Sequence, residues 1–348
     1  MPFYKKPVLI LIFGVIVLSG IVLFVNQSKK EQAPPKEVIA INGTAMGSVY
    51  AITINDTPHN ITPVKLKQLI TTRLSKIEHT FSLWDASSEL SKINAAPPQH
   101  WIPISEDMSY IMQAGLKFYI ESANIFDPTI LPLLQLWGFG PSENTTEPTP
   151  TEISDTLRTI GFKHIGIEDL RIKKNKGNLK IDFSAIIPGY AADQTALILE
   201  HYQVKNYLIN IGGEMRINGK NPDNKPWEIG IENPTNAPHT AEDLSATIKL
   251  SSGALATSGS YRRFKGSGEK KRHHIIDPRT GYPAASDTVS VTVYADSAIK
   301  ADALSTVLLI MGSKGGLAWL AQHPDYAAYF IREDGTTVWS NNFSPLLK

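Results

Sequence analysis

Apolar residues spaced three or four positions apart predict the first helix of the chain. Over residues 64–80 they are Leu66, Ile70, Leu74 and Ile77. This spacing gathers them on one face of a helix that can pack against a core. The same kind of pattern predicts further helices over residues 105–123, 189–202, 297–311 and 314–322.

Alternation with a period of two predicts strands at 49–54 and 289–294, and the apolar run 207–211 before two glycines predicts a buried strand. Residues 141–156 are rich in Pro, Thr, Ser and Glu and predict a surface loop. Helices and strands alternate without a regular βαβ rhythm, and neither GxGxxG nor GxxxxGK[ST] occurs, which argues against a Rossmann or P-loop site. We therefore predict an α+β fold: one large domain over 38–348, with a mainly antiparallel sheet and packed helices.

The N-terminal segment breaks this amphipathic pattern. The nineteen residues from Pro7 to Val25 carry no charge, and as a helix they would extend roughly 28 Å, about the hydrocarbon thickness of a bilayer. A cleaved signal peptide is the alternative, but it usually has a shorter apolar core and a small-residue cleavage site. We expect residues 1–30 to be an uncleaved single-pass membrane anchor and residues 31–37 to be a polar linker. The domain would then lie on the periplasmic, extracytoplasmic side of a bacterial inner membrane.

Composition narrows the class of partner. The 348 residues hold 34 Lys+Arg and 33 Asp+Glu, and 42% are hydrophobic, as in ordinary globular proteins. Four lysines and no acids fall in residues 1–30, so the rest of the chain has a net charge of −3. This argues against nucleic acid as the main partner. The chain has no cysteine, which excludes disulfides, thiolate nucleophiles and cysteine-ligated metals.

Two segments carry residues suited to phosphate chemistry. Asp302 and Thr306 are four residues apart in a predicted helix, so they share one face and could present oxygen ligands to Mg²⁺. From spacing alone, a structural hydrogen bond or an exposed helix face is the simpler explanation. His274 precedes the turn sequence Asp277-Pro278-Arg279-Thr280-Gly281. It could act as a base or stabilise the loop.

Three further segments have similar alternatives. Asp182-Phe183-Ser184-Ala185 precedes a predicted helix, whose N-terminus could bind an anion such as pyrophosphate or simply follow a strand-to-helix turn. The aromatic residues of 124–129 and 136–140 could contact a flat ligand or fill the core. Asn210-Ile211-Gly212-Gly213-Glu214 is a tight turn.

Taken together and in order, these pieces resemble the ApbE family of FAD:protein FMN transferases, from about Gly43 to Asp334. The resemblance is carried by segments 43–47, 81–84, 88–94, 126–129, 137–140, 189–193, 210–214, 257–259, 274–281 and 301–306. It implies transfer of the FMN half of FAD to a Thr or Ser of an acceptor protein, with release of AMP. The implied acceptor is a flavoprotein subunit of a membrane redox complex with an S/A-G-A-T/S type motif.

The resemblance also implies roles for individual residues. Mg²⁺, or Mn²⁺, would be bound by the Ala185 carbonyl with Asp302, Ser305 and Thr306. His274 would be the catalytic base. FAD would be contacted at eight family positions, which are Met46, Trp84, Ile125, Phe126, Asp127, Asp182, Pro188 and Ile276.

Two positions depart from the family pattern. Pro188 stands where members usually carry Lys or another polar residue, and Ser260 stands where many carry Asp. Because Pro188 offers no charge and no N–H, a non-catalytic FAD-binding protein is one alternative. Hydrolysis of FAD to FMN and AMP is a second, and a membrane-tethered scaffold without flavin is a third. Ser252-Gly253-Ala254-Leu255 resembles the acceptor motif, but Leu255 has no hydroxyl, so self-modification there is discounted.

Overall fold

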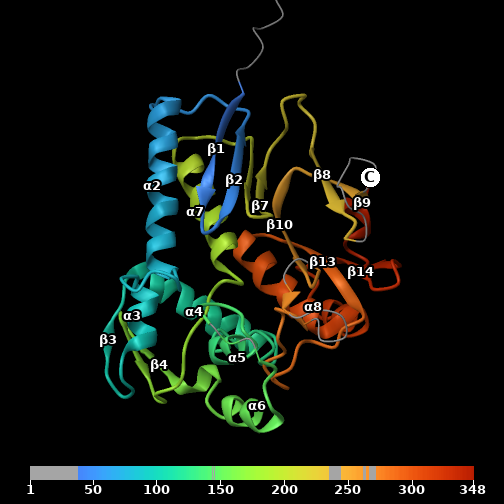
Figure 1. Ribbon diagram of the computed structural model, residues 1–348. Coiled ribbons are helices and arrows are strands. Elements are labelled where there is room, and N and C mark those ends of the chain that lie inside the picture. The colour runs from blue at the N-terminus through green and yellow to red at the C-terminus, as the bar shows by residue number, and fades with distance from the viewer. Residues whose placement is uncertain (1–37, 143, 145, 235–243, 262–263, 266–271) are drawn as a thin grey trace, which may run out of the picture. The chain divides into compact units, whose positions relative to one another are not determined.

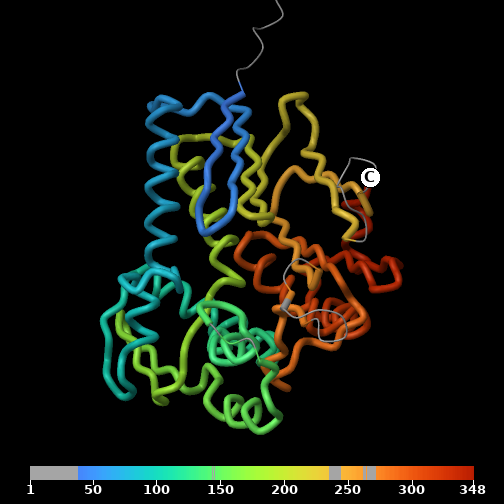
Figure 2. Tube along the Cα trace, in the orientation of Figure 1, coloured from blue at the N-terminus to red at the C-terminus, as the bar shows by residue number. Residues whose placement is uncertain are grey.

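A computed structural model describes residues 38–142, 144, 146–234, 244–261, 264–265 and 272–348. Its centre is an eight-stranded antiparallel sheet in the order β1-β2-β6-β7-β10-β13-β14-β15 (Figure 1). The strands are β1 (Ile39–Ala45), β2 (Ser48–Ile54), β6 (Tyr207–Ile211), β7 (Glu214–Asn218), β10 (Ser252–Gly259), β13 (Thr288–Ala295), β14 (Ala327–Arg332) and β15 (Thr337–Trp339). Figure 2 shows the β1–β2 hairpin beside strands that come much later in the chain, because β2 pairs with β6.

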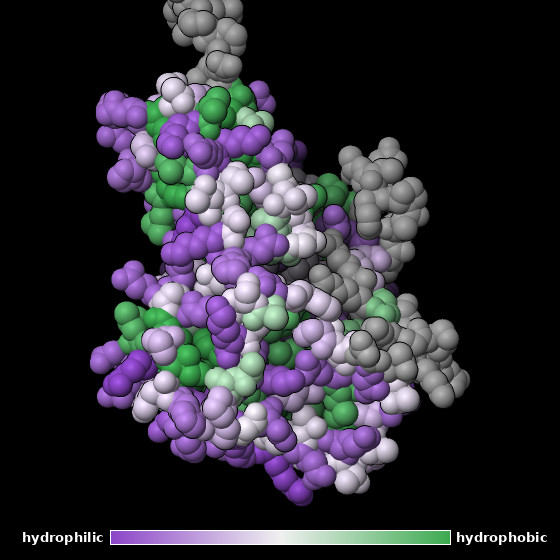
Figure 3. Space-filling view, turned by 60° about the vertical axis from the view of Figure 1, so that its left-hand side comes forward, coloured by the Kyte–Doolittle hydropathy of each residue, from purple (hydrophilic) through white to green (hydrophobic). Residues whose placement is uncertain are grey.

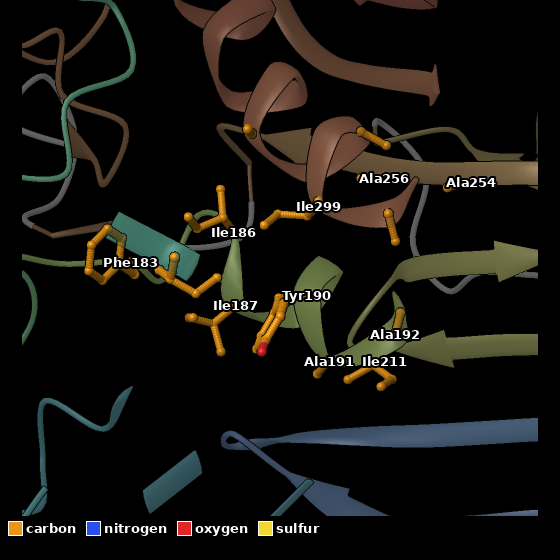
Figure 4. Packing of buried hydrophobic residues seen from close by; sticks show 14 of the residues in the cluster. Phe183, Ile186, Ile187, Tyr190, Ala191, Ala192, Ile211, Ala254, Ala256 and Ile299 are labelled. Atoms are coloured by element: carbon orange, nitrogen blue, oxygen red, sulfur yellow. The ribbon is translucent and has the colours of Figure 1, made fainter. Parts of the chain in front are cut away.

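Helices cover one face of this sheet. They are α2 (Pro63–Phe81), α7 (Ile187–His201) and α8 (Ala298–Leu320), and their apolar faces join the sheet in the largest core cluster (Figure 4). Along β10, Ala254 and Ala256 belong to this cluster, whereas Leu255 belongs to a second one. This is the alternation expected when both faces of a strand are covered. On the second face lies the hairpin of β8 (Trp227–Glu232) and β9 (Leu244–Leu250).

The segment between β2 and α7 contains the smaller elements. Its helices are α3 (Glu89–Ala95), α4 (Glu106–Glu121), α5 (Leu131–Leu136), α6 (Pro150–Leu157) and the 3₁₀ turn η1 (Phe162–His164). A three-stranded sheet in the order β3-β5-β4 consists of β3 (Ile102–Pro103), β5 (Arg171–Lys174) and β4 (Ile165–Glu168). Two short strands, β11 (Phe264–Lys265) and β12 (Arg272–His273), and the 3₁₀ turn η4 (Ser344–Leu346) complete the described elements. On the face shown in Figure 3, polar and apolar residues are mixed, with the apolar ones in separate groups.

The α+β fold with a mainly antiparallel sheet is confirmed, and so are the predicted strands and the helices near 64–80, 105–123 and 189–202. The two helices predicted at 297–311 and 314–322 form one element, α8, interrupted at Gly312 with φ 72° and ψ 171°. The surface loop predicted over 141–156 is wrong in its second half, where α6 begins at Pro150. Thr149 and Glu152 form a reciprocal capping box there, so a capping signal outweighs the polar composition.

The proposed anchor and linker, residues 1–37, lie outside the described residues. Among the residues that the structure does describe, one helix is long and apolar enough to cross a membrane, namely α8. Most of its apolar stretch is buried inside the domain. We therefore assign α8 to the core.

Candidate active site

Two tight turns meet at one end of the main sheet. β1 and β2 are joined by Met46 and Gly47, both with positive φ, and β6 and β7 are joined by Gly212 and Gly213, also with positive φ. Because β2 pairs with β6, the turns are neighbours, and the Gly212 N–H donates to the Val49 carbonyl at 3.0 Å. Met46 is an uncommon residue for a left-handed position. Its half-buried side chain packs against the main core.

Helices α7 and α8 cap each other beside these turns. The Gly189 N–H, in the first turn of α7, donates to Asp302 Oδ2 of α8 at 2.9 Å. In return, Asp193 of α7 accepts from the first two N–H groups of α8, those of Ala298 and Ile299, at 2.9 Å each. Neither helix has a side-chain cap of its own at this end. Each carboxylate therefore stabilises the positive end of the other helix.

Hydroxyl groups surround the next turn of α8. Ser305 Oγ donates to the Asp302 carbonyl at 2.8 Å. Ser258 Oγ, at the end of β10, lies 2.7 Å from Ser305 Oγ and 3.2 Å from Thr306 Oγ1. The Ser305 and Thr306 hydroxyls thus face Ser258 of β10, whereas the Asp302 carboxylate faces Gly189 of α7. Ser258 is an additional hydroxyl that spacing along one helix could not reveal. We call Asp302, Ser305, Thr306 and Ser258 the carboxylate–hydroxyl cluster.

The environment of Asp302 disfavours its negative charge. Burial raises the pKa of Asp302 well above its usual range, and the nearby charge of Glu214 raises it further. The Gly189 hydrogen bond lowers this pKa, and the Asp193 charge raises it again. Glu214 is the first residue of β7 and Asp193 lies in α7. A cation bound at Asp302 would therefore offset the carboxylate's own charge and the repulsion from these two acidic neighbours.

The donor set fits a hard cation that also binds substrate oxygens. Within the described residues, no three His, Cys, Asp or Glu side chains converge as a conventional metal site. A site at Asp302 would instead combine one carboxylate with hydroxyl, carbonyl and phosphate oxygens, which Mg²⁺ accepts. Ala185, whose carbonyl is the remaining candidate ligand, is half-buried two residues before α7.

Asp127 and Asp182 come from adjacent segments. The Asp182 N–H donates to the Pro128 carbonyl at 2.7 Å, and Ile130 forms a parallel bridge with Lys180. Asp127 Oδ1 accepts from the Thr129 N–H at 2.9 Å and the Thr129 hydroxyl at 2.6 Å. Burial raises the pKa of Asp127, and both Thr129 hydrogen bonds oppose this. The two carboxylates predicted to contact FAD therefore share one edge of the fold.

The apolar FAD candidates occupy different environments. Ile125 and Phe126 are buried in the main core, and Phe126 packs edge-on to Phe118 at 5.6 Å. Trp84, in the loop between α2 and α3, is 77% exposed and free to cover a flat ring. Ile276 is buried in a small cluster with residues of α5 and α6. Pro188 is half-buried in the first turn of α7.

His274 directly follows β12 and is half-buried. Its ring meets Phe139 edge-on at a centroid distance of 6.3 Å, so the aromatic segment 136–140 supports this histidine. A cavity of about 40 Å³ is lined by residues of several segments, among them His273, Ile275, Ser260 and Leu309 of α8. The His274 segment therefore lies beside the end of β10, two residues beyond Ser258.

Sequence reasoning missed several groups that the fold brings to this site. Ser258, Gly189, Asp193 and Glu214 all lie within motifs used for the family resemblance, but none was singled out as a site residue. Ser258 reaches α8 from β10, and Asp193 reaches it from α7, where it bonds the first N–H groups of α8. In the sequence, the only local sign of a site was that the acidic residues Glu214 and Asp193 follow glycines closely.

Comparison with known proteins agrees with this architecture. A model described as the ApbE family matches residues 46–330. An FAD:protein FMN transferase of Haemophilus influenzae is 32% identical over 324 residues, covering 90% of this chain and 92% of that protein. An FAD:protein FMN transferase of Escherichia coli K12 is 29% identical, and the match covers 93% of this chain and 91% of that protein.

Solved structures with a similar fold are also ApbE flavin transferases. The flavin transferase ApbE from Vibrio cholerae superposes with a TM-score of 0.80 and 31% identity, covering 90% of this chain and all of that one. The apo form of the flavinyl transferase ApbE from Pseudomonas stutzeri superposes with a TM-score of 0.80 and 29% identity. The match covers 91% of this chain and 99% of that one. Sequence and fold thus agree over nearly the whole described region, and the chain belongs to the ApbE family.

Proposed function

We propose that this protein is an FAD:protein FMN transferase. The observation that carries the proposal is the carboxylate–hydroxyl cluster, with buried Asp302 at its centre, in a chain that is similar over nearly its whole length to proteins of that name. The acceptor would be a Thr or Ser in an S/A-G-A-T/S type motif of a flavoprotein subunit of a membrane redox complex. The products would be the FMN-modified acceptor and AMP.

The reaction breaks a phosphoanhydride bond and forms a phosphoester bond. The acceptor oxygen attacks the phosphorus of the FMN half, a new P–O bond forms, and the anhydride bond to AMP breaks. The acceptor hydroxyl loses its proton to His274, the candidate base, and AMP leaves with the bridging oxygen. A positioned base of this kind typically contributes about 10²–10⁴-fold to the rate.

The chain's own residues suit a metal-assisted version of this transfer. Asp302, Ser305, Thr306 and the Ala185 carbonyl would hold Mg²⁺, with Mn²⁺ as the alternative ion. When bound, the ion would neutralise charge on the diphosphate. Ser258 would orient the two hydroxyl groups of α8, because it contacts both of them.

The remaining candidate residues would bind FAD. Trp84 is exposed and aromatic, which suits stacking on the isoalloxazine ring. The buried Ile125, Phe126 and Ile276 would act through backbone or shape rather than as free platforms, whereas Met46 would present its thioether at the β1–β2 turn. Asp127 and Asp182 would accept hydrogen bonds from FAD.

Pro188 supports one second candidate, a non-catalytic FAD-binding protein. Proline cannot make a charged or hydrogen-bonding side-chain contact to FAD from this position, and Ser260 replaces an acidic residue of the family pattern. The two candidates differ in turnover, because the second binds FAD without producing AMP. We keep the transferase as the conclusion, since the metal candidates and His274 are all present.

We also propose the arrangement of the full chain: an anchor over residues 1–30, a linker over 31–37 and one transferase domain over 38–348. The domain would face the periplasm, where it could reach membrane redox proteins. The charge-free run of residues 7–25 supports this arrangement. Alkaline extraction of membranes would test it, since an anchored chain stays with the membrane pellet and a cleaved one does not.

The deciding experiment measures the intact mass of an acceptor domain. The full chain is incubated with FAD, Mg²⁺ and a small domain bearing the motif. An FMN mass increment that is lost on chelation is the expected result. Free FMN and AMP with an unmodified acceptor would instead identify hydrolysis, and intact FAD with no product would favour the non-catalytic candidate.

A further inference from the structure

A buried ion pair lies behind the active site, on the far side of α7. Arg73 of α2 binds Asp107 of α4 with two parallel hydrogen bonds of 2.7 and 2.6 Å. The side chains are only 18% and 11% exposed. The Arg73 guanidinium holds the pKa of Asp107 well below its usual range. Such two-pronged pairs fix geometry as well as charge.

This ion pair extends to α7 through two side chains. Arg73 Nη2 donates to the Tyr190 hydroxyl at 2.9 Å and to Gln194 Oε1 at 2.8 Å, and the Tyr190 hydroxyl donates to Asp107 Oδ1 at 2.6 Å. Tyr190 and Gln194 are four residues apart on the same helix face. One face of the first turns of α7 is therefore tied to both α2 and α4.

The Tyr190 ring is held as firmly as its hydroxyl. It stacks on Tyr110 at 5.4 Å and meets Phe81 edge-on at 6.4 Å. Figure 4 shows its oxygen on the side away from Ile299 of α8. Tyr190 is thus directed toward the ion pair while the neighbouring backbone faces α8.

The residue before Tyr190 touches the Asp302 carboxylate directly. The Gly189 N–H donates to Asp302, and the Gly189 Cα lies so close to α8 that an added Cβ would be 2.4 Å from the Ala298 oxygen and 2.9 Å from Asp302 Cβ. Since α7 has no side-chain cap of its own, its start is positioned by these contacts and by Tyr190. Gly189, the residue next to Tyr190 in α7, therefore connects Tyr190 to Asp302 directly.

We propose that Tyr190, oriented by the Arg73–Asp107 pair, is a positioning residue for Asp302. It keeps the Gly189 N–H directed at one carboxylate oxygen, which leaves the other oxygen oriented for a divalent cation. The inference rests on the metal role proposed for Asp302. It adds a network of residues that touch neither FAD nor the metal. Partners that orient a metal ligand commonly change metal affinity about 10–100-fold when they are removed.

The test compares two tyrosines that lose the same atom. Tyr190→Phe removes the hydroxyl and keeps the ring. Tyr207→Phe is the matched control, because Tyr207 is also fully buried and its hydroxyl donates to Glu200, near the C-terminal end of α7, at 2.6 Å. Mn²⁺ binding to the full chain without FAD or acceptor is measured from the electron paramagnetic resonance signal of the free ion. We expect about tenfold weaker binding for Tyr190→Phe, less than twofold for Tyr207→Phe, and similar losses of melting temperature for both.

A second variant acts at the other end of the network. Arg73→Lys keeps the charge but lacks the planar guanidinium that binds Asp107 through two nitrogens. It should therefore also weaken Mn²⁺ binding. At saturating Mn²⁺, the rate of FMN transfer by Tyr190→Phe and by Arg73→Lys should stay within about twofold of the parent rate. Unchanged Mn²⁺ binding in Tyr190→Phe and Arg73→Lys, equal weakening in the Tyr207→Phe control, or no binding by the parent would each overturn the inference. If the variants bind Mn²⁺ more weakly but the parent chain transfers no FMN, only the proposed function is wrong.

Discussion

Replacing Gly189 by alanine probes the contact on which the site geometry depends. The added Cβ would lie 2.4 Å from the Ala298 carbonyl oxygen, 2.7 Å from its carbon and 2.9 Å from Asp302 Cβ. Two of these atoms belong to the backbone, so no flexible side chain can yield. An ordinary contact begins near 3.4 Å, and α7 and α8 must therefore separate by about 1 Å.

Overpacking of a rigid contact typically costs about 1–3 kcal/mol. Glycine-to-alanine changes in helices otherwise stabilise by about 0.5–1 kcal/mol. Gly315→Ala is the matched control in α8, because its added Cβ would meet only Met311 Cβ at 3.5 Å. Urea unfolding followed by tryptophan fluorescence should therefore show a lower free energy of unfolding for Gly189→Ala and an unchanged or higher one for Gly315→Ala.

The same variant should weaken Mn²⁺ binding, because separation of α7 from α8 breaks the hydrogen bond from Gly189 to Asp302. A Gly189→Ala protein as stable as its parent would refute the packing argument. A destabilised variant with unchanged Mn²⁺ affinity would show that Asp302 is positioned by α8 alone.

The other predictions concern individual side chains. Asp302→Asn should abolish Mg²⁺-dependent FMN transfer while the chain stays folded; full transfer in the acceptor mass assay would remove the metal assignment. His274→Ala should keep FAD affinity, measured by flavin fluorescence, and lose about 10²–10⁴-fold in transfer rate; an unimpaired variant would exclude it as the base. Because Arg73 lowers the folded-state pKa of Asp107, this carboxylate stabilises the fold above pH ~4, and its contribution is lost as the pH falls further. Asp107→Asn should thus lower the free energy of unfolding by about 2 kcal/mol at pH 7. Below pH ~4 its stability should fall less steeply with pH than that of the parent; equal slopes for the two proteins would contradict this. Pro188→Lys should change FAD affinity but not Mn²⁺ affinity, and equal changes in both would show that the two sites are not separable.

Much of the fold follows from local pattern, because helices and strands differ in the period of their apolar residues. Leu66, Ile70, Leu74 and Ile77 are all fully buried in α2, as their spacing predicts. The interruption of α8 at Gly312 was also visible as a gap between two apolar patterns. Its cause is tertiary: Asp287 accepts from the Ser313 N–H at 2.8 Å and so begins the second half of the helix.

The candidate site was harder to predict, because its residues are far apart in the sequence and come together only in the folded chain. Asp302 and Thr306 could be paired because both lie on one helix. Ser258 joins them only because β10 packs beneath α8, and Tyr190 gains its role only because α2 and α4 supply Arg73 and Asp107. No spacing in the sequence encodes these contacts.

The departure at Pro188 shows how one turn of helix can serve two requirements. As the second residue of α7, Pro188 occupies a position whose N–H has no partner within a helix. Proline therefore replaces the polar side chain of the family pattern without costing α7 a hydrogen bond. The next N–H, that of Gly189, is the one that binds Asp302. Under the proposed function, variation at Pro188 would thus alter what α7 offers to FAD, while the Gly189–Asp302 hydrogen bond stays intact.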